Sequence, residues 1–113
     1  MPYIKAKTSV KVSPEQAATI KTELGKAITN LGKSEAWLMV EVEDNCRLWF
    51  RGDNSEGIAY VEVALFGKAS ADQYDEMTKA VCEILSGTLG ISGEEIYVKY
   101  EEVDHWGYNS FNF

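Results

Sequence analysis

The residue with the most distinctive chemistry in this chain is Pro2, because it directly follows Met1. A small residue in second place generally allows the initiator methionine to be removed, which would turn the Pro2 nitrogen into a secondary amine. An exposed terminal amine has a pKa of about 8. Burial in an apolar pocket, or a nearby cation, lowers that pKa because each disfavours the charged form. The result would be a free amine near neutral pH, where a general base works best.

An incidental proline is the alternative interpretation. Proline makes up about 5% of average sequences, so it occupies any given position at roughly that rate. If Met1 is retained, the Pro2 nitrogen is a tertiary amide and has no basicity. Catalysis by Pro2 therefore requires the removal of Met1.

Composition restricts the function classes. The chain has 113 residues, a net charge of −7, 45% hydrophobic and 26% charged residues, which predicts a single soluble domain over residues 1–113. The acidic balance argues against nucleic acid, and no apolar run reaches the ~20 residues needed for membrane insertion. No secretory signal is visible, so we expect a cytoplasmic protein. Cys46, Cys82 and His105 lack metal-ligand spacing, so we expect neither metal nor cofactor.

The first half of the chain predicts a β-α-β unit that would hold Pro2 on a strand over residues 1–7. Ser13 is a suitable N-cap for a helix, with Pro14 at its first position and Gln16 completing a capping box. Apolar residues recur at helical spacing up to Gly32, a typical helix stop. Residues 37–43 then alternate between apolar and other side chains, which predicts a strand.

The second half repeats this order. Residues 58–66 form an apolar run typical of a buried strand, and the segment 70–73 is a second capping box. The helix that follows ends at Gly90, and residues 96–102 predict another strand. We therefore predict an α+β fold in which two β-α-β repeats form a four-stranded mixed sheet with two helices on one face.

That arrangement leaves one sheet face bare, and we expect it to carry apolar residues from several strands. The last nine residues, 105–113, add four aromatic side chains. Such surfaces are unusual for a monomer. We expect an oligomer in which the tail lies along a neighbour's sheet edge.

Short motifs along the whole chain resemble the macrophage migration inhibitory factor family of the tautomerase superfamily. They are Met1-Pro2, Leu31-Gly32-Lys33 followed by Trp37, Phe50-x-Gly52 with Ser55-Glu56, Phe66-Gly67-Lys68, Ile91-Ser92 before Ile96-Tyr97-Val98, Trp106-Gly107-Tyr108-Asn109 and the final Phe113. No single motif is specific, but their order and spacing agree with the two β-α-β halves.

The resemblance implies a homotrimer with active sites at the subunit interfaces. It also implies cofactor-free keto–enol tautomerisation of small aromatic acids such as phenylpyruvate, or of dopachrome. Some family members act outside the cell as cytokines on cell-surface receptors and are secreted without a signal peptide.

The resemblance also assigns roles to individual residues. Pro2 matches the catalytic base, and Lys33 matches a lysine that can hold a substrate carboxylate and keep Pro2 neutral. A lysine just past a helix end can instead neutralise the helix dipole.

Five further residues match substrate-binding positions. Phe66 replaces the usual pocket isoleucine, and Tyr97 matches a tyrosine contributed by a neighbouring subunit. Trp37 and Trp106 fall at the pocket rim, where aromatic surface suits an aryl substrate. Lys99 replaces an asparagine that contacts substrate in vertebrate members. By periodicity alone, each of these aromatic residues would more often belong to the core.

Three hypotheses follow. The first is a phenylpyruvate-type tautomerase that uses Pro2 and Lys33. The second is a cytokine-like receptor-binding protein with a vestigial pocket. The third is a monomeric ferredoxin-like binding module in which Pro2 is incidental.

Overall fold

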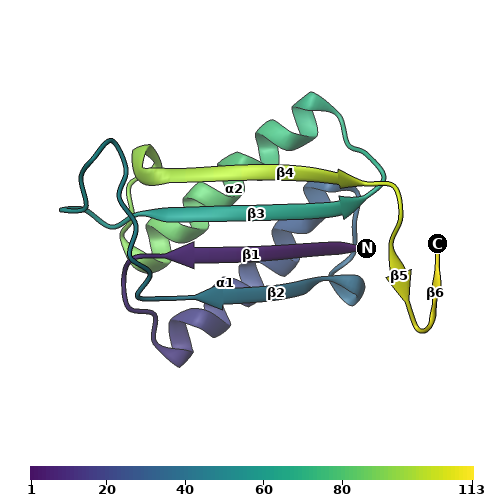
Figure 1. Ribbon diagram of the computed structural model, residues 1–113, viewed down its shortest axis with the longest axis horizontal. Helices are drawn as coiled ribbons and strands as arrows, with labels where there is room; N and C mark the ends of the chain where they lie inside the picture. Colours follow the sequence, from purple (N-terminus) through teal and green to yellow (C-terminus); the bar gives the residue numbers. More distant parts are fainter.

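The computed structural model describes all residues from Met1 to Phe113 and consists of a sheet with two helices packed against one face (Figure 1). The strands are β1 (Pro2–Thr8), β2 (Met39–Glu43), β3 (Ala59–Phe66) and β4 (Ile96–Val103), and the helices are α1 (Pro14–Ala27) and α2 (Ala71–Leu89). The strand order is β2-β1-β3-β4. β1 pairs parallel to β2, β3 pairs parallel to β4, and β1 and β3 are antiparallel. The predicted pair of β-α-β units and the mixed sheet are confirmed.

Local sequence signals determine where both helices begin. The Ser13 and Ser70 side chains accept from the backbone amides of Gln16 and Gln73, whose own side chains accept from the capping residues. Both predicted capping boxes are therefore present. α1 continues into a 3₁₀ turn, η1 (Ile28–Leu31), before Gly32 ends it with a left-handed φ of 71°.

The hydrophobic core lies between the sheet and the helices. Alternate residues of β1 and β3 are buried, which is the pattern of strands with one covered face. The sheet contributes Ile4, Ala6, Val61, Val63 and Leu65, and the helical layer contributes Ile20, Leu24, Ile28, Met77, Val81 and Leu85. This packing fixes the strand starts that carry the candidate site.

The strand predicted over residues 37–43 begins two residues later than expected. Residues Glu35–Trp37 form a 3₁₀ turn, η2, and β2 starts only at Met39. The cause is local, because the Ser34 hydroxyl accepts from the Ala36 amide and so favours a turn over an extended chain.

The open sheet face carries apolar or aromatic residues from all four strands, among them Tyr3, Met39, Tyr60 and Tyr97, but a row of charges divides it. Across the middle of this face, register places Glu41, Lys5, Glu62 and Lys99 side by side in that order. Charges of opposite sign therefore alternate from one strand to the next. Such neighbours attract each other across a sheet, so the face does not require apolar cover at this level.

The aromatic tail is ordered within the single chain, and its predicted contact with a neighbour's sheet edge stays a prediction. It turns back on itself as a small hairpin of β5 (Gly107–Tyr108) and β6 (Phe111–Asn112), beyond the sheet at the end where the chain starts (Figure 1). Asn109 and Ser110 have positive φ angles of 51° and 80° and form its tight turn. Within one chain, the tail thus pairs with itself.

Candidate active site at the start of strand β1

Pro2 is buried at the first position of β1, on the same face as Ile4. β1 lies between β2 and β3, and Pro2 pairs with Leu65 near the end of β3. The Phe66 amide donates to the Met1 carbonyl over 3.0 Å. The start of the chain is therefore held in the sheet rather than left as a free tail.

Lys33 reaches the same corner from the end of the first helical segment. The left-handed conformation of Gly32 turns the chain. The Lys33 amide then donates a hydrogen bond to the Ile28 carbonyl over 3.4 Å, at the end of the helical segment. The Lys33 ammonium then donates to the Phe66 carbonyl over 2.9 Å. Phe66 thus links the two predicted catalytic elements through its amide and its carbonyl.

The electrostatics of this corner favour an uncharged amine. The pKa of the Met1 amino group is lowered from its ordinary 8.0, first by burial and second by the Lys33 cation. These are the two effects that stabilise the neutral form of a base. A terminal amine is more readily deprotonated here than in open solvent.

A largely apolar cavity of about 710 Å³ opens beside the chain start. Its walls are Met1, Pro2, Tyr3, residues 36–41 and residues 106–108. Trp37 and Trp106, both predicted at a pocket rim, line it together. Its size and apolar walls, with Lys33 held close to the chain start, suit a small aromatic acid.

The C-terminal hairpin adds two aromatic residues that the sequence analysis did not assign to the site. Tyr108 meets Trp37 edge-to-face at 5.3 Å, and Phe113 stacks on Tyr108 at 6.3 Å. Phe113 also contacts Phe66, with ring centroids 5.9 Å apart. The signal in the sequence that points to these two residues is the density of aromatic side chains in the tail.

Tyr97 and Lys99 lie away from this cavity within one chain. Across the sheet, Tyr97 lies level with Lys7 of β1. Lys7 is roughly 17 Å along the strand from Pro2, at about 3.4 Å per residue. The Tyr97 ring packs on Phe50 instead, at 4.7 Å. Lys99 borders a separate cavity of about 240 Å³ on the open sheet face. The structure thus gathers Pro2, Lys33, Phe66, Trp37 and Trp106, and leaves these two apart.

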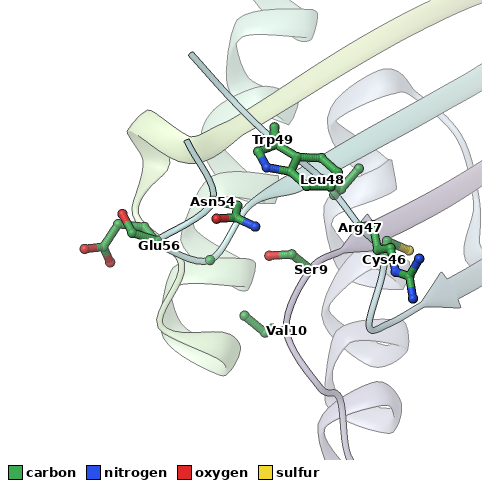
Figure 2. Close-up of a pocket in the computed structure, with 10 residues that line it drawn as sticks. Ser9, Val10, Cys46, Arg47, Leu48, Trp49, Asn54 and Glu56 are labelled. Atoms are coloured by element: carbon green, nitrogen blue, oxygen red, sulfur yellow. The ribbon is translucent and has the colours of Figure 1, made fainter. Parts of the chain in front are cut away.

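A second hollow lies at the opposite end of the sheet, and Figure 2 shows the side chains around it. It measures about 620 Å³ and is lined by Ser9, Val10 and residues 46–49 and 54–57. None of the predicted site residues belongs to it. Burial raises the pKa of its Cys46 thiol and also that of Cys82, so neither is disposed to act as a nucleophile.

Two further properties of the structure bear on the class of site. No group of three or more His, Cys, Asp or Glu side chains is placed to hold a metal ion. None of the helices combines the length and the apolar character needed to cross a membrane.

The four-stranded mixed sheet built from two β-α-β units, with two helices on one face, is the fold of the tautomerase superfamily. The chain belongs to the macrophage migration inhibitory factor family, whose model matches residues 1–111. The resemblance suggested by the sequence motifs is thereby confirmed.

Solved structures agree with this assignment. Leishmania major MIF2 is 29% identical, with a TM-score of 0.93 over 100% of this chain and 97% of that chain. A macrophage migration inhibitory factor homologue from Prochlorococcus marinus is 28% identical, with a TM-score of 0.89 over 98% of both chains. The Toxoplasma gondii factor is 21% identical with a TM-score of 0.91, over 98% of this chain and 99% of that chain, and shares the fold. Among curated protein sequences, none matches the chain significantly.

Proposed function

We propose that this protein is a keto–enol tautomerase for small aromatic keto acids of the phenylpyruvate type. Its general base would be the Pro2 amine after removal of Met1. The observation that carries the proposal is the corner shared by Met1, Phe66 and Lys33, where burial and a cation lower the pKa of a terminal amine.

The reaction needs only proton transfers. The Pro2 amine takes a proton from the carbon next to the substrate carbonyl, and the electron pair of the broken C–H bond forms the C=C bond. The carbonyl oxygen becomes an enolate, which takes up a proton to give the enol. Pro2 releases its proton to complete the cycle, so no redox partner or cofactor is required.

Lys33 and the two tryptophans have complementary roles in this proposal. The Lys33 ammonium binds the substrate carboxylate and opposes protonation of Pro2. Trp37 and Trp106 provide apolar wall area for the aryl ring. The Phe66 backbone binds both Met1 and Lys33 and so holds them together. The Phe66 ring contacts Phe113 and limits the space beside the chain start on that side.

We further propose that the working form is a homotrimer. Trp49 is 61% exposed, as is Tyr97, and residues 47–49 form no backbone hydrogen bonds within the chain. Unpaired backbone beside exposed aromatics favours association with the sheet edge of another copy. Tyr97 and Lys99, which lie far from Pro2 in their own chain, would then reach a neighbour's cavity.

The decisive test is phenylpyruvate tautomerisation, followed by ultraviolet absorbance, on protein whose intact mass establishes whether Met1 is present. Turnover is expected from the clipped form and none from a form that retains Met1. Pro2→Gly should abolish turnover while the assembly stays intact in sedimentation. A clipped trimer without turnover would overturn the proposal and favour the cytokine-like receptor-binding alternative.

A further inference from the structure

Helix α1 has a gap in its surface at Gly25, and the Glu35 side chain fills it. A Cβ atom added at Gly25 would overlap the Glu35 carboxylate and would lie only 2.9 Å from its Cγ. Gly25 is itself buried, in the last turns of α1. Glu35 thus occupies the volume that any other residue at position 25 would need.

Glu35 begins the short turn that joins two predicted site residues. Lys33 precedes the turn η2, and Trp37 is its last residue. The turn is held internally by the Trp37 and Leu38 amides, which donate to the carbonyls of Ser34 and Glu35. The Glu35 side chain adds a contact between this turn and the rigid helix behind it.

We propose that Gly25 and Glu35 are positioning residues that fix the segment 33–37, so that Lys33 stays bound to the Phe66 carbonyl and Trp37 lines the cavity beside Pro2. The inference rests on the proposed function for its meaning in catalysis. Glycine inside a helix is unfavourable compared with alanine, so its presence here calls for a local reason. The space that Gly25 leaves for the Glu35 side chain is such a reason. Gly87 in α2 offers a contrast, since a Cβ there meets no atom within 4 Å.

Gly25→Ala separates this role from a role in stability. The colliding atoms are the flexible end of Glu35, which can turn into solvent while the helix keeps its course. The free energy of unfolding should therefore be unchanged or raised, whereas the segment 33–37 loses the contact between Glu35 and helix α1. At a pH well above the pKa of the Pro2 amine, we expect KM to rise about fivefold with kcat changed less than about twofold, because carboxylate binding by Lys33 is affected while the amine stays neutral.

Glu35 variants test the same contact from the other side. Glu35→Ala should raise KM as Gly25→Ala does, and the double variant should be no worse than either single variant, because both remove one interaction. Glu35→Gln preserves the size of the side chain and should retain the wild-type KM. Gly87→Ala is the matched control and should leave both kinetic parameters unchanged.

A readout independent of turnover keeps this inference separate from the proposed function. Hydrogen exchange at the Trp37 and Leu38 amides should be faster in Gly25→Ala and Glu35→Ala, and unchanged in Gly87→Ala. If the wild-type protein shows no turnover, the proposed function fails and the exchange data alone decide the contact. Unchanged exchange in both variants would overturn the inference. So would additive effects on KM, or a Glu35→Gln variant that behaves like Glu35→Ala.

Discussion

At the scale of single residues, the candidate site depends on one cation placed beside one amine. The Lys33 ammonium donates a hydrogen bond to the Phe66 carbonyl, and the Phe66 amide donates one to the Met1 carbonyl. A base must be neutral to accept a proton, so the proposed activity should be present above the pKa of the Pro2 amine and lost as the pH falls through it. Burial and Lys33 lower the pKa of the Met1 amine at this corner, and the same two effects should lower that of the Pro2 amine and extend activity towards lower pH.

Replacing Lys33 should therefore move the acid limb of the pH profile. In Lys33→Met the cation is gone, the pKa of the amine rises, and the acid limb of kcat/KM shifts to higher pH. The profile of kcat/KM reports the free enzyme, so substrate binding does not obscure the shift. Lys26→Met is a suitable control, since Lys26 is exposed in α1 and pairs with Glu23. An unmoved limb in Lys33→Met would contradict electrostatic coupling.

The sequence predicted the site residues unevenly. Five of the seven gather around the chain start, because strand and helix boundaries alone bring them to one end of the sheet. Tyr108 and Phe113 were missed because their contacts depend on the hairpin turn at Asn109 and Ser110. A positive φ at two successive non-glycine residues is a feature that composition does not reveal.

At the scale of elements, the helix starts are the features best encoded in the sequence. A capping box is a contact between residues three apart, so four letters suffice to specify it. The open sheet face is different, because its character depends on which strands become neighbours. The row formed by Glu41, Lys5, Glu62 and Lys99 appears only once the register of all four strands is known.

The capping box of α2 gives a prediction about stability. Ser70→Ala removes the acceptor for the Gln73 amide and should lower the free energy of unfolding by about 1 kcal/mol. Ser70→Asp keeps an acceptor at the cap and adds a negative charge at the helix start, so it should remain close to wild type. Urea unfolding followed by circular dichroism measures both. Equal loss in the two variants would mean that the hydroxyl acts through something other than the cap.

At the scale of the whole molecule, the arrangement within one chain leaves the proposed site open on one side. The cavity beside Pro2 has apolar walls from β1, β2 and the C-terminal segment. Tyr97, by contrast, is 61% exposed on β4, the opposite edge strand. Opposite edges of one sheet meet through a head-to-tail contact between copies, and such contacts form a ring when the rotation between copies closes. The proposed trimer is an arrangement of this kind.

Subunit complementation tests whether two chains build one site. Pro2→Gly removes the secondary amine and the rigid ring of the proposed base, and Tyr97→Ala removes the residue proposed to come from the neighbour, so each variant alone should lose kcat/KM. When the two are refolded together in equal amounts, about one quarter of the interfaces in a head-to-tail trimer combine an intact Pro2 with an intact Tyr97. Activity should rise towards about that fraction of the wild-type value, measured at low substrate concentration.

The same experiment distinguishes a shared site from a self-contained one. If each chain holds its own Pro2 and Tyr97 together, every chain in the mixture carries one defect and refolding restores nothing. Mixing the two folded variants without refolding should also restore nothing as long as subunits do not exchange, which provides the baseline. Recovery only after refolding would require Tyr97 to act on another chain's Pro2. Absence of recovery in verified mixed trimers would overturn the shared site, and a wild-type kcat/KM in Tyr97→Ala alone would leave packing on Phe50 as the role of Tyr97.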